Sequence, residues 1–500
     1  MPNRKLDNQP QTRADILFGR NSRAVSHRVH RVINDLSPRS LRAQAKRARE
    51  KKLSIQQCKV KKEQINIENK LKRRFIMKRK IRFFGIMIVV AFVAAAIYGR
   101  GVYDGESDKG LSIISEAEAA EDKGYSPVKA RARDFYAPNS EDLGPNEMRL
   151  IACGTGMPTA RPKQAASCWL LELGNGDKFL FDVGTGSAER IAAMQIPYNY
   201  LDKVFLSHLH TDHFGDLDAL FVGGALAGRQ KPLRVWGPKG DTPERGTKYA
   251  LDHLFKALTW DIDGRAGITD PRGYQPFEVT EFDYKGVNKI IYQENGVTIR
   301  SIPAIHSLDG PVSFIVEWNG LKFVFGGDTY PNKWYAKYAK DADLAIHECF
   351  VAVPDMITKF KFTPQGALAV GTQIHTAPEA FGKMMSIVNP RMAVAYHFFK
   401  DFDTAGPIND RIRTTYDGPL SLAEDYMVWN ITKDDIRVRM AIVDEDVWPP
   451  PATEKPQVPD PKLRVPYSKF IVGGKYDMKE VIQPTYDEVN KKYGLNEKQD

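Results

Sequence analysis

The sequence predicts an α/β domain with αββα layers, spanning residues 148–446 of the 500-residue chain. Short apolar runs that end in polar or glycine-rich turns are typical of strands, and segments with helical spacing lie between them. Because strands and helices mix without a strict βαβα alternation, two packed sheets covered by helices are favoured over a barrel. A hydrophobic fraction of 42% and a charged fraction of 27% exclude a wholly disordered, fibrous or polytopic membrane chain.

The elements follow one another with clear boundaries. The first four predicted strands occupy residues 149–153, 168–173, 178–182 and 203–207, and a Gly/Pro loop separates the first two. A later hairpin is expected from residues 311–318 and 321–325. Helical spacing of apolar residues appears at 187–194, 247–259 and 377–388. Residues 447–500 form a proline-rich C-terminal extension, which we expect to wrap the surface.

The basic charge of the chain is confined to its N-terminus. Residues 1–82 hold 25 Lys and Arg against 6 Asp and Glu, whereas the remainder holds 47 against 56, a net charge of −9. Since nucleic-acid affinity comes largely from basic side chains, nucleic acid is not an expected partner of the acidic domain. For the basic segment itself, binding to nucleic acid or anionic lipid stays an alternative.

The N-terminal part divides into three segments before the domain. Residues 1–76 are expected to be a basic, disordered extension, either cytoplasmic or the product of a mis-annotated start that should lie at Met77. Residues 77–98 combine a basic start, the apolar run 83–98 and three alanines, which indicates a signal peptide or a membrane anchor. Residues 99–147 are expected to form a linker. We therefore expect export to the periplasm or the exterior, or anchoring in the membrane through residues 83–98 if they are not cleaved.

Cysteine usage gives no sign of a disulfide scaffold. The four cysteines, Cys58, Cys153, Cys168 and Cys349, are scattered, and the sequence contains no CxxC pair.

Potential metal ligands are concentrated directly after the strand predicted at 203–207. Three histidines and an aspartate lie within six residues, namely His208, His210, Asp212 and His213. Because these side chains cannot all share one face of a regular element, we expect a loop that turns them toward one point. Imidazole and carboxylate ligands suit Zn²⁺, with Mn²⁺ or Fe²⁺ as alternatives. The competing interpretation is a solvated polar loop, although this cluster holds three of the ten histidines.

These residues resemble the HxHxDH motif of the metallo-β-lactamase-fold superfamily. The later landmarks of that family follow in order: His306 in IPAIHS, Asp328 in FGGDT and His397 in AYHF. The resemblance covers about residues 148–440 and implies an αββα sandwich with two divalent metal ions, Zn²⁺ being the first choice. It implies that one ion is held by His208, His210 and His306 and the other by Asp212, His213 and His397, with Asp328 bridging them.

Two further motifs resemble the ribonuclease Z and arylsulfatase branch of the family. They are HE at residues 347–348 and HTA at residues 375–377. The resemblance implies that His375 and Glu348 form a relay that donates a proton to the leaving group. Asp212 would ligate a metal and accept a proton from the attacking water. We interpret His347 as a core histidine that supports the fold and His253 as a structural or surface residue.

At a closer level the chain resembles metallo-hydrolases associated with guanitoxin biosynthesis. The similar segments are IPYNYLDK at residues 196–203, GDTYPNKW at 327–334 and YHFFKDFDT at 396–404. Aromatic residues near these motifs line a pocket or belong to the core: Tyr330, Trp334, Phe350 and Phe398.

The reaction predicted from these residues is hydrolysis of an ester-type bond in a small molecule: a phosphodiester, sulfate ester, lactone or carboxylic ester. The alternatives are a ribonuclease Z-like endonuclease that processes tRNA 3′ ends and a non-catalytic metal-binding envelope protein. In the tRNA-processing enzymes that the chain resembles, a long arm inserted in the core grips the tRNA. His306 and Asp328 are only 22 positions apart, so the interval between them has no room for such an arm. A di-iron redox protein is disfavoured because no flavodoxin-like domain is present. A homodimer is compatible with the sequence.

Overall fold

The computed structural model describes residues 135–159, 161–444, 446–448, 450–452 and 457–498. The expected basic extension at 1–76, the expected signal or anchor at 77–98 and most of the expected linker at 99–147 lie outside the described residues. Within the described ranges, no helix has both the length and the apolar character needed to cross a bilayer.

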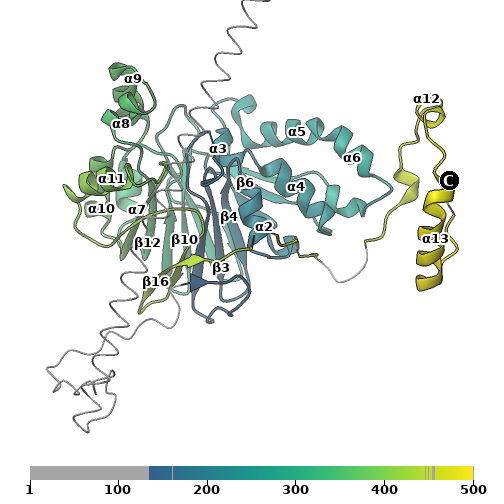
Figure 1. Ribbon diagram of the computed structural model, residues 1–500. Helices are drawn as coiled ribbons and strands as arrows, with labels where there is room; N and C mark the ends of the chain where they lie inside the picture. Colours follow the sequence, from purple (N-terminus) through teal and green to yellow (C-terminus); the bar gives the residue numbers. More distant parts are fainter. Residues whose placement is uncertain (1–134, 160, 445, 449, 453–456, 499–500) are drawn as a thin grey trace, which may run out of the picture. The chain divides into compact units, whose positions relative to one another are not determined.

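The core of the molecule is a sandwich of two mixed sheets, so the predicted αββα class is confirmed (Figure 1). The first sheet has the strand order β1-β16-β15-β2-β3-β4-β5-β6-β7 and the second β14-β13-β12-β11-β10-β9-β8. The strands of the first sheet are β1 (Phe135–Tyr136), β2 (Met148–Gly154), β3 (Cys168–Leu173), β4 (Lys178–Val183), β5 (Lys203–Phe205), β6 (Arg234–Pro238), β7 (Glu278–Phe282), β15 (Met427–Ile431) and β16 (Ile436–Ala441). Those of the second are β8 (Lys289–Glu294), β9 (Val297–Pro303), β10 (Val312–Trp318), β11 (Leu321–Phe325), β12 (Leu344–Glu348), β13 (Met392–Tyr396) and β14 (Leu420–Leu422).

The central strands read as continuous apolar runs because both of their faces are buried. In β3, Trp169 and Leu171 point between the sheets, whereas Cys168 and Leu170 point toward the helices on the outer side. The space between the sheets is filled largely by aromatic rings, and Phe181 contacts Phe205, Phe314, Phe323 and Phe325. This packing holds the two sheets in a fixed relation, and both sheets contribute loops to the site described below.

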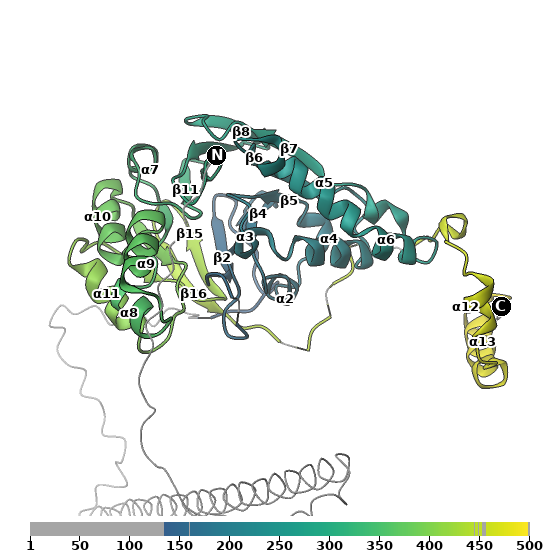
Figure 2. The ribbon, with the colours of Figure 1, turned by 90° about the horizontal axis from the view of Figure 1, so that it is seen from above.

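Helices cover both outer faces of the sandwich. Figure 2 shows α7 to α11 on one side of the strands and α4 to α6 on the other. The helices of the first sheet's side are α2 (Ala188–Ala193), α3 (Thr211–Phe214), α4 (Leu217–Leu226), α5 (Thr247–Ala257) and α6 (Thr259–Arg265), with short turns η1 (Tyr198–Tyr200), η2 (Pro243–Arg245) and η3 (Pro271–Tyr274). The helices on the other side are α7 (Lys333–Tyr338), α8 (Val353–Thr358), α9 (Pro364–Ala369), η4 (Val370–Ile374), α10 (Pro378–Val388) and α11 (Ala405–Arg413). The C-terminal extension contains η5 (Pro461–Leu463), α12 (Lys469–Gly473) and α13 (Lys479–Tyr493).

The structure differs from the sequence-based expectations in four places. The expected metal loop contains a one-turn helix, α3, which carries Asp212 and His213. The helix expected at 247–259 ends at Ala257, and a second helix begins at Thr259, whose hydroxyl donates to the Lys256 carbonyl. The sheet begins at Phe135 rather than at residue 148, because β1 pairs with β16. The proline-rich extension contains α12 and α13, neither of which has a buried residue.

Candidate metal centre

The seven predicted metal ligands lie at the carboxyl ends of strands from both sheets. His208 and His210 follow β5, and α3 directly after them carries Asp212 and His213. The second sheet supplies the others: His306 follows β9, Asp328 follows β11 and His397 follows β13. Ends of neighbouring parallel strands meet at one edge of a sheet, and here β11, β12 and β13 are parallel neighbours. The topology therefore gathers residues that are almost two hundred positions apart in the sequence.

The seven side chains form two groups, each with its ligand atoms close enough to share one metal ion. The first group, called here the three-histidine group, is His208, His210 and His306. The second, called here the buried group, is Asp212, His213, Asp328 and His397. Such His and Asp clusters are consistent with the dinuclear metal site that is typical of this kind of sandwich.

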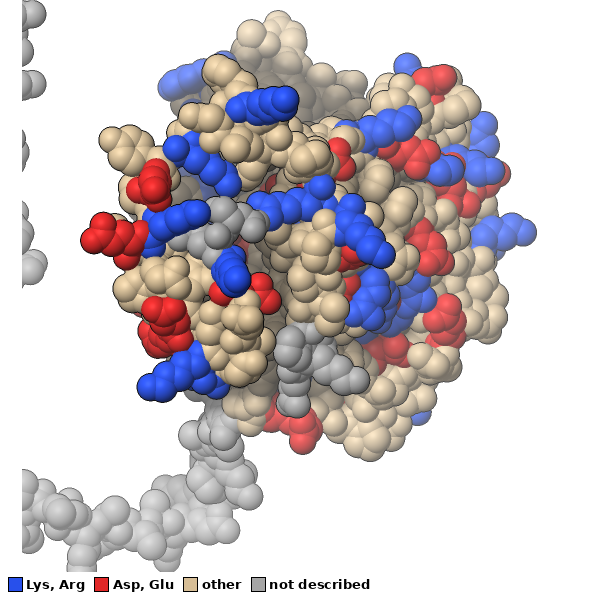
Figure 3. Space-filling model, turned by 90° about the vertical axis from the view of Figure 1, so that its right-hand side faces the viewer, with Lys and Arg blue, Asp and Glu red and all other residues tan. Residues whose placement is uncertain are grey.

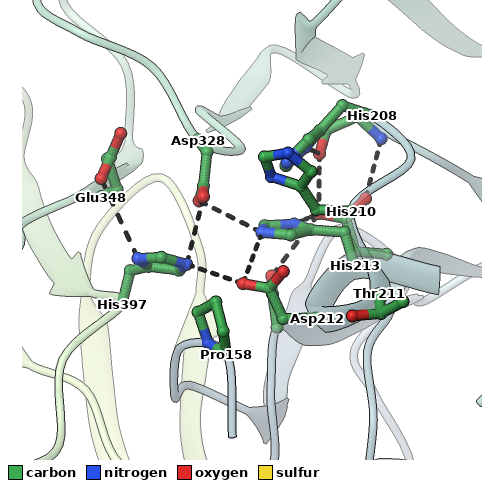
Figure 4. Close-up of polar contacts among 12 residues, drawn as sticks. Pro158, His208, His210, Thr211, Asp212, His213, Asp328, Glu348 and His397 are labelled. Carbon is green, nitrogen blue, oxygen red and sulfur yellow. Dashed lines mark hydrogen bonds and ion pairs between the residues drawn. The ribbon is translucent and has the colours of Figure 1, made fainter. Parts of the chain in front are cut away.

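In the buried group the ligand atoms converge on one point (Figure 4). The His397 Nε2 atom lies 3.1 Å from Asp212 Oδ2 and 3.1 Å from Asp328 Oδ2. The His213 Nε2 atom lies 3.2 Å from Asp328 Oδ1 and 3.5 Å from Asp212 Oδ2. All four residues are buried.

The three-histidine group is more open and also lies close to Asp328. The His306 Nε2 and His210 Nδ1 atoms are 3.1 Å apart, and His306 Nε2 is 3.8 Å from Asp328 Oδ2. His208 is buried, whereas His210 is exposed. Because Asp328 lies within reach of both groups, its carboxylate is placed where a bridging ligand is needed.

A buried carboxylate that the sequence interpretation gave no role, Asp182 at the end of β4, orients ligands in both groups. His213 Nδ1 donates to Asp182 Oδ2 at 2.6 Å, which directs His213 Nε2 into the buried group. The Ser207 hydroxyl donates to the same oxygen at 2.8 Å and accepts from His208 Nδ1 at 3.1 Å. Metal-ligating histidines usually donate their second nitrogen to a carboxylate or another acceptor in this way. The strand-end position of Asp182 was the only sequence signal for this role.

Unpaired buried atoms and altered pKa values show that these residues suit a cation. Among the described residues, His208 Nε2, His213 Nε2 and both Asp328 side-chain oxygens are buried without a hydrogen-bond partner. Burial lowers the pKa of His306 to about 4, so that its imidazole is neutral and free to ligate. Burial raises the pKa of Asp328, but the neighbouring His213 and His397 lower it by more. The pKa of Asp328 therefore lies well below its usual range. A buried carboxylate that stays ionised requires positive charge beside it, as a bound cation provides.

His375 and Glu348 form a pair next to the buried group. His375 Nδ1 lies 2.6 Å from Glu348 Oε2, and Glu348 Oε1 accepts from the Thr329 backbone N–H at 2.7 Å. Burial lowers the pKa of His375, but the Glu348 carboxylate raises it more, to about 9. Phe350 stacks on the His375 ring with the ring centroids 4.2 Å apart and an interplanar angle of 9°. His375 is therefore held flat and protonated, and among the described residues its Nε2 atom has no hydrogen-bond partner.

Two residues of the site have strained backbones. Asp182 and His397 have φ values of 58° and 72°, in the left-handed region that side chains other than glycine rarely adopt. Such conformations cost about 1–3 kcal/mol each and persist where the surroundings fix them. For His397 the backbone N–H donates to the Thr155 carbonyl at 2.9 Å. Gly184 permits the close approach of α3, because a Cβ there would lie 2.1 Å from the Asp212 carbonyl oxygen.

A pocket of about 320 Å³ opens beside the three-histidine group. Its walls come from the ligand residues themselves, from the segment between β6 and α5 and from the loop after His306. The lining includes His208, His210, Leu209, Phe214, Lys239, Arg245, His306, Leu308 and Pro311. The buried group does not line this pocket, so the pocket meets the metal centre on its three-histidine side.

The remaining residues singled out in the sequence have simpler surroundings. His347 is buried, and its ring contacts Tyr335 and Phe381, in agreement with a core role. His253 is exposed on α5. Phe398 is fully buried, and the four aromatic residues noted in the sequence do not line the 320 Å³ pocket: Tyr330, Trp334, Phe350 and Phe398. Cys153, Cys168 and Cys349 are buried free thiols, while Cys58 lies outside the described residues.

Comparison with known proteins places the chain in a family. The profile of the Metallo-beta-lactamase superfamily matches residues 161–333, which include six of the seven candidate ligands but not His397, Glu348 or His375. Ribonuclease Z of Mycobacterium marinum is 33% identical over 218 residues, covering 43% of this chain and 74% of that protein. Ribonuclease Z of Mycolicibacterium gilvum is 30% identical over 208 residues, with 40% and 68% covered. A solved metallo-β-lactamase fold protein from Bacillus subtilis is 17% identical and covers 57% of this chain and 99% of its own, with a TM-score of 0.43.

The chain belongs to the metallo-β-lactamase superfamily. Within that superfamily it is distantly related to ribonuclease Z, by about 30% identity over about 40% of its length.

Proposed function

We propose that the protein is a dinuclear metal-dependent hydrolase that cleaves an ester-type bond in a small molecule. The bond would be a phosphodiester, sulfate ester, lactone or carboxylic ester. The observation that carries this proposal is the position of the His375–Glu348 pair, joined at 2.6 Å, directly beside two groups of metal-ligand side chains. A protein that only stored a metal would have no need of a protonated imidazole with a free nitrogen at that place.

Each group of ligand side chains would hold one of the two ions. His208, His210 and His306 would hold one, and Asp212, His213 and His397 the other, with Asp328 between them. When bound, two divalent cations, Zn²⁺ first with Mn²⁺ or Fe²⁺ as alternatives, make water a nucleophile at neutral pH and stabilise negative charge on the attacked group.

The side chains of the protein move the protons. The Asp212 carboxylate, whose Oδ2 atom lies 3.1 Å from His397 Nε2 in the buried group, would accept the proton that the attacking water loses. His375 would donate its Nε2 proton to the leaving oxygen, because Glu348 holds its Nδ1 atom and keeps the ring charged. The flat contact with Phe350 would keep the ring in the orientation that this donation requires.

The size of the pocket supports a small substrate. A volume of about 320 Å³ lies at the lower end of the range that small-molecule sites occupy, about 300–1,000 Å³. Apolar side chains such as Leu209, Phe214 and Leu308 form part of the wall. The closer resemblance to guanitoxin-type metallo-hydrolases fits a small-molecule substrate but supplies no further chemistry.

The second candidate is a ribonuclease Z-like tRNA endonuclease, which the names of the relatives favour. Against it stands the charge of the chain after residue 82, a net −9. Lys and Arg are interspersed with Asp and Glu on the face in Figure 3, and the segment 239–277 between β6 and β7 carries six of each sign. The interval between His306 and Asp328 is the hairpin of β10 and β11, without an arm.

One experiment separates these functions. The full chain is loaded with Zn²⁺ or Mn²⁺ and assayed at physiological salt. The substrates are bis(p-nitrophenyl) phosphate, p-nitrophenyl sulfate, p-nitrophenyl acetate, a lactone and a precursor tRNA. We expect turnover of at least one small ester and no efficient tRNA cleavage. Cleavage of the tRNA with a kcat/KM of about 10⁴ M⁻¹s⁻¹ or more would favour the endonuclease. Two bound metal ions with no turnover of any substrate would favour a non-catalytic metal-binding envelope protein.

We further propose that the protein is exported or membrane-anchored through residues 77–98. The support is the basic start, apolar run and alanine end of that segment. Fractionation of cells that express an epitope-tagged chain beginning at Met77 tests this, and recovery only from the soluble cytoplasm would contradict it.

A further inference from the structure

One buried residue that is neither a ligand nor a proton donor connects the loops of the second sheet that carry the site. Thr329 follows Asp328 and is fully buried. Its hydroxyl, backbone N–H and carbonyl bond to three different segments: the loop of His306, Glu348 at the end of β12, and the loop of His375.

The hydroxyl of Thr329 fixes the loop of His306. Its Oγ1 atom accepts from the Ile305 N–H at 3.0 Å and from Asn332 Nδ2 at 3.0 Å, and donates to the Tyr330 carbonyl at 3.0 Å. All the capacity of the hydroxyl, one donor and two acceptors, is therefore used. Asn332 in turn caps α7 by accepting from two backbone N–H groups, so the hydroxyl ties Ile305 to a helix.

The backbone of Thr329 fixes the proton-donating pair. Its N–H donates to Glu348 Oε1 at 2.7 Å, which leaves Oε2 for His375. Its carbonyl accepts from the Thr376 hydroxyl at 2.7 Å, and Thr376 is the neighbour of His375 in the chain. Thr329, which follows Asp328 in the chain, therefore positions both Glu348 and His375.

We propose that Thr329 is the positioning residue that sets the three-histidine group and the His375–Glu348 pair at a fixed distance from Asp328. The proposal rests on the proposed function, because it takes these residues to be metal ligands and a proton donor. It assigns two separable effects: the hydroxyl controls metal affinity through His306, and the bond from Thr376 controls proton donation through His375.

The first test removes the hydroxyl and keeps the shape. In Thr329→Val the Ile305 N–H loses its acceptor and Asn332 Nδ2 keeps only the Tyr330 carbonyl at 3.3 Å. The bond from the Tyr330 N–H to the Ile305 carbonyl at 2.6 Å remains. We expect the affinity of the three-histidine group for Zn²⁺ to fall about 10- to 100-fold, the usual effect of losing support behind a ligand. Thr329→Ser should restore it. The measurement is competition of the full chain with a zinc chelator, independent of catalysis.

Thr415→Val is the matched control. The Thr415 hydroxyl donates to the Glu379 carbonyl at 2.8 Å and joins α10 to α11, away from the ligand loops. Its loss should lower thermal stability without changing zinc affinity. Equal zinc affinities in Thr329→Val, Thr415→Val and the unsubstituted chain would overturn the proposal, and so would an unsubstituted chain that binds no zinc. A chain that binds two ions but hydrolyses nothing would refute the proposed function while leaving this result to stand.

Thr376→Val tests the second effect and decides the matter if Thr329→Val does not fold. It removes the bond to the Thr329 carbonyl and leaves every ligand in place. We expect unchanged zinc content, an altered ¹⁵N NMR signal of the His375 imidazole and a rate that falls about tenfold on esters with poor leaving groups but little on nitrophenyl esters. An unchanged imidazole signal, or losses equal for both kinds of ester, would contradict the assigned role.

Discussion

The two halves of the metal centre differ in exposure and in charge. The buried group contains two carboxylates and no exposed residue, whereas the three-histidine group is built of imidazoles and includes the exposed His210. Only the three-histidine group lines the 320 Å³ pocket. Carboxylates in a buried place require a cation to compensate them, while neutral imidazoles do not. Under the proposed function, an ion in the buried group would be held mainly by charge, and an ion in the three-histidine group would be the one that meets substrate.

The largest effect is expected when the two halves lose their common residue. Asp328→Ala removes a carboxylate within reach of both groups, so the metal content should fall from two ions per chain to one or fewer. The rate should fall by about 10³-fold or more, since a Lewis-acidic cation contributes several kcal/mol to transition-state stabilisation. Elemental analysis and single-substrate kinetics measure both quantities. His253→Ala, which removes an exposed histidine on α5, is the control, and two ions retained by Asp328→Ala would contradict the bridging position.

The next effect separates a ligand from the proton donor. Asp212→Ala should lower metal content and rate together. His375→Ala should leave the ions in place and lower the rate on poor leaving groups by about 10²–10⁴-fold. The loss should shrink with nitrophenyl leaving groups, which need little protonation. A leaving-group series for both variants checks this, and losses in His375→Ala that do not depend on the leaving group would argue against the acid role.

A smaller effect should distinguish the two halves through the residues behind them. Asp182→Asn weakens the acceptor of His213 Nδ1 and of the Ser207 hydroxyl. Ser207→Ala removes the acceptor of His208 Nδ1 and one hydrogen bond to Asp182, but it leaves the bond between Asp182 and His213 in place. We expect metal affinity to fall about 10- to 100-fold in the first variant, chiefly in the buried group. In the second the loss should be smaller and confined to the three-histidine group. Stepwise zinc titration resolves the two sites, and identical titrations would show that the halves are not supported separately.

The smallest effect concerns exchange and needs no substitution. A chelator that reaches the protein from solvent should remove metal in two phases, the faster from the three-histidine group because His210 is exposed. Time-resolved chelation of protein loaded with two ions measures the phases. A single phase for both ions would remove the distinction between an open and a buried half.

The sequence could supply candidate ligands that the structure brings together in two groups, because four of the seven lie in one short, dense motif. His208, His210, Asp212 and His213 lie within six positions directly after a strand, and such a density of imidazole and carboxylate groups is typical of a metal site. The layered fold was equally accessible, since strands buried on both faces read as apolar runs. His397 was found only through the resemblance to a family, because a single histidine after a strand is ambiguous.

The supporting residues could not be predicted in the same way. Asp182 is separated from His213 by 31 positions, and its role depends on a left-handed backbone and on the end point of β4. The role of Thr329 lies in its hydrogen bonds to Ile305, Glu348 and Thr376, which belong to three segments that the tertiary fold brings together. Local patterns also gave no sign that the chain after Val447 forms helices, because its prolines are typical of irregular structure.

The supply of ligands by both sheets has a consequence for folding. Residues from His208 to His397 can surround an ion only after the two sheets have docked, and such distant pairings form late because closing long loops is slow. Contacts that are absent from the folding transition state alter the unfolding rate and leave the folding rate almost unchanged. Bound zinc should therefore slow the unfolding of this protein. It would lengthen the lifetime of the folded chain many-fold while the refolding rate stays nearly the same with or without the ion.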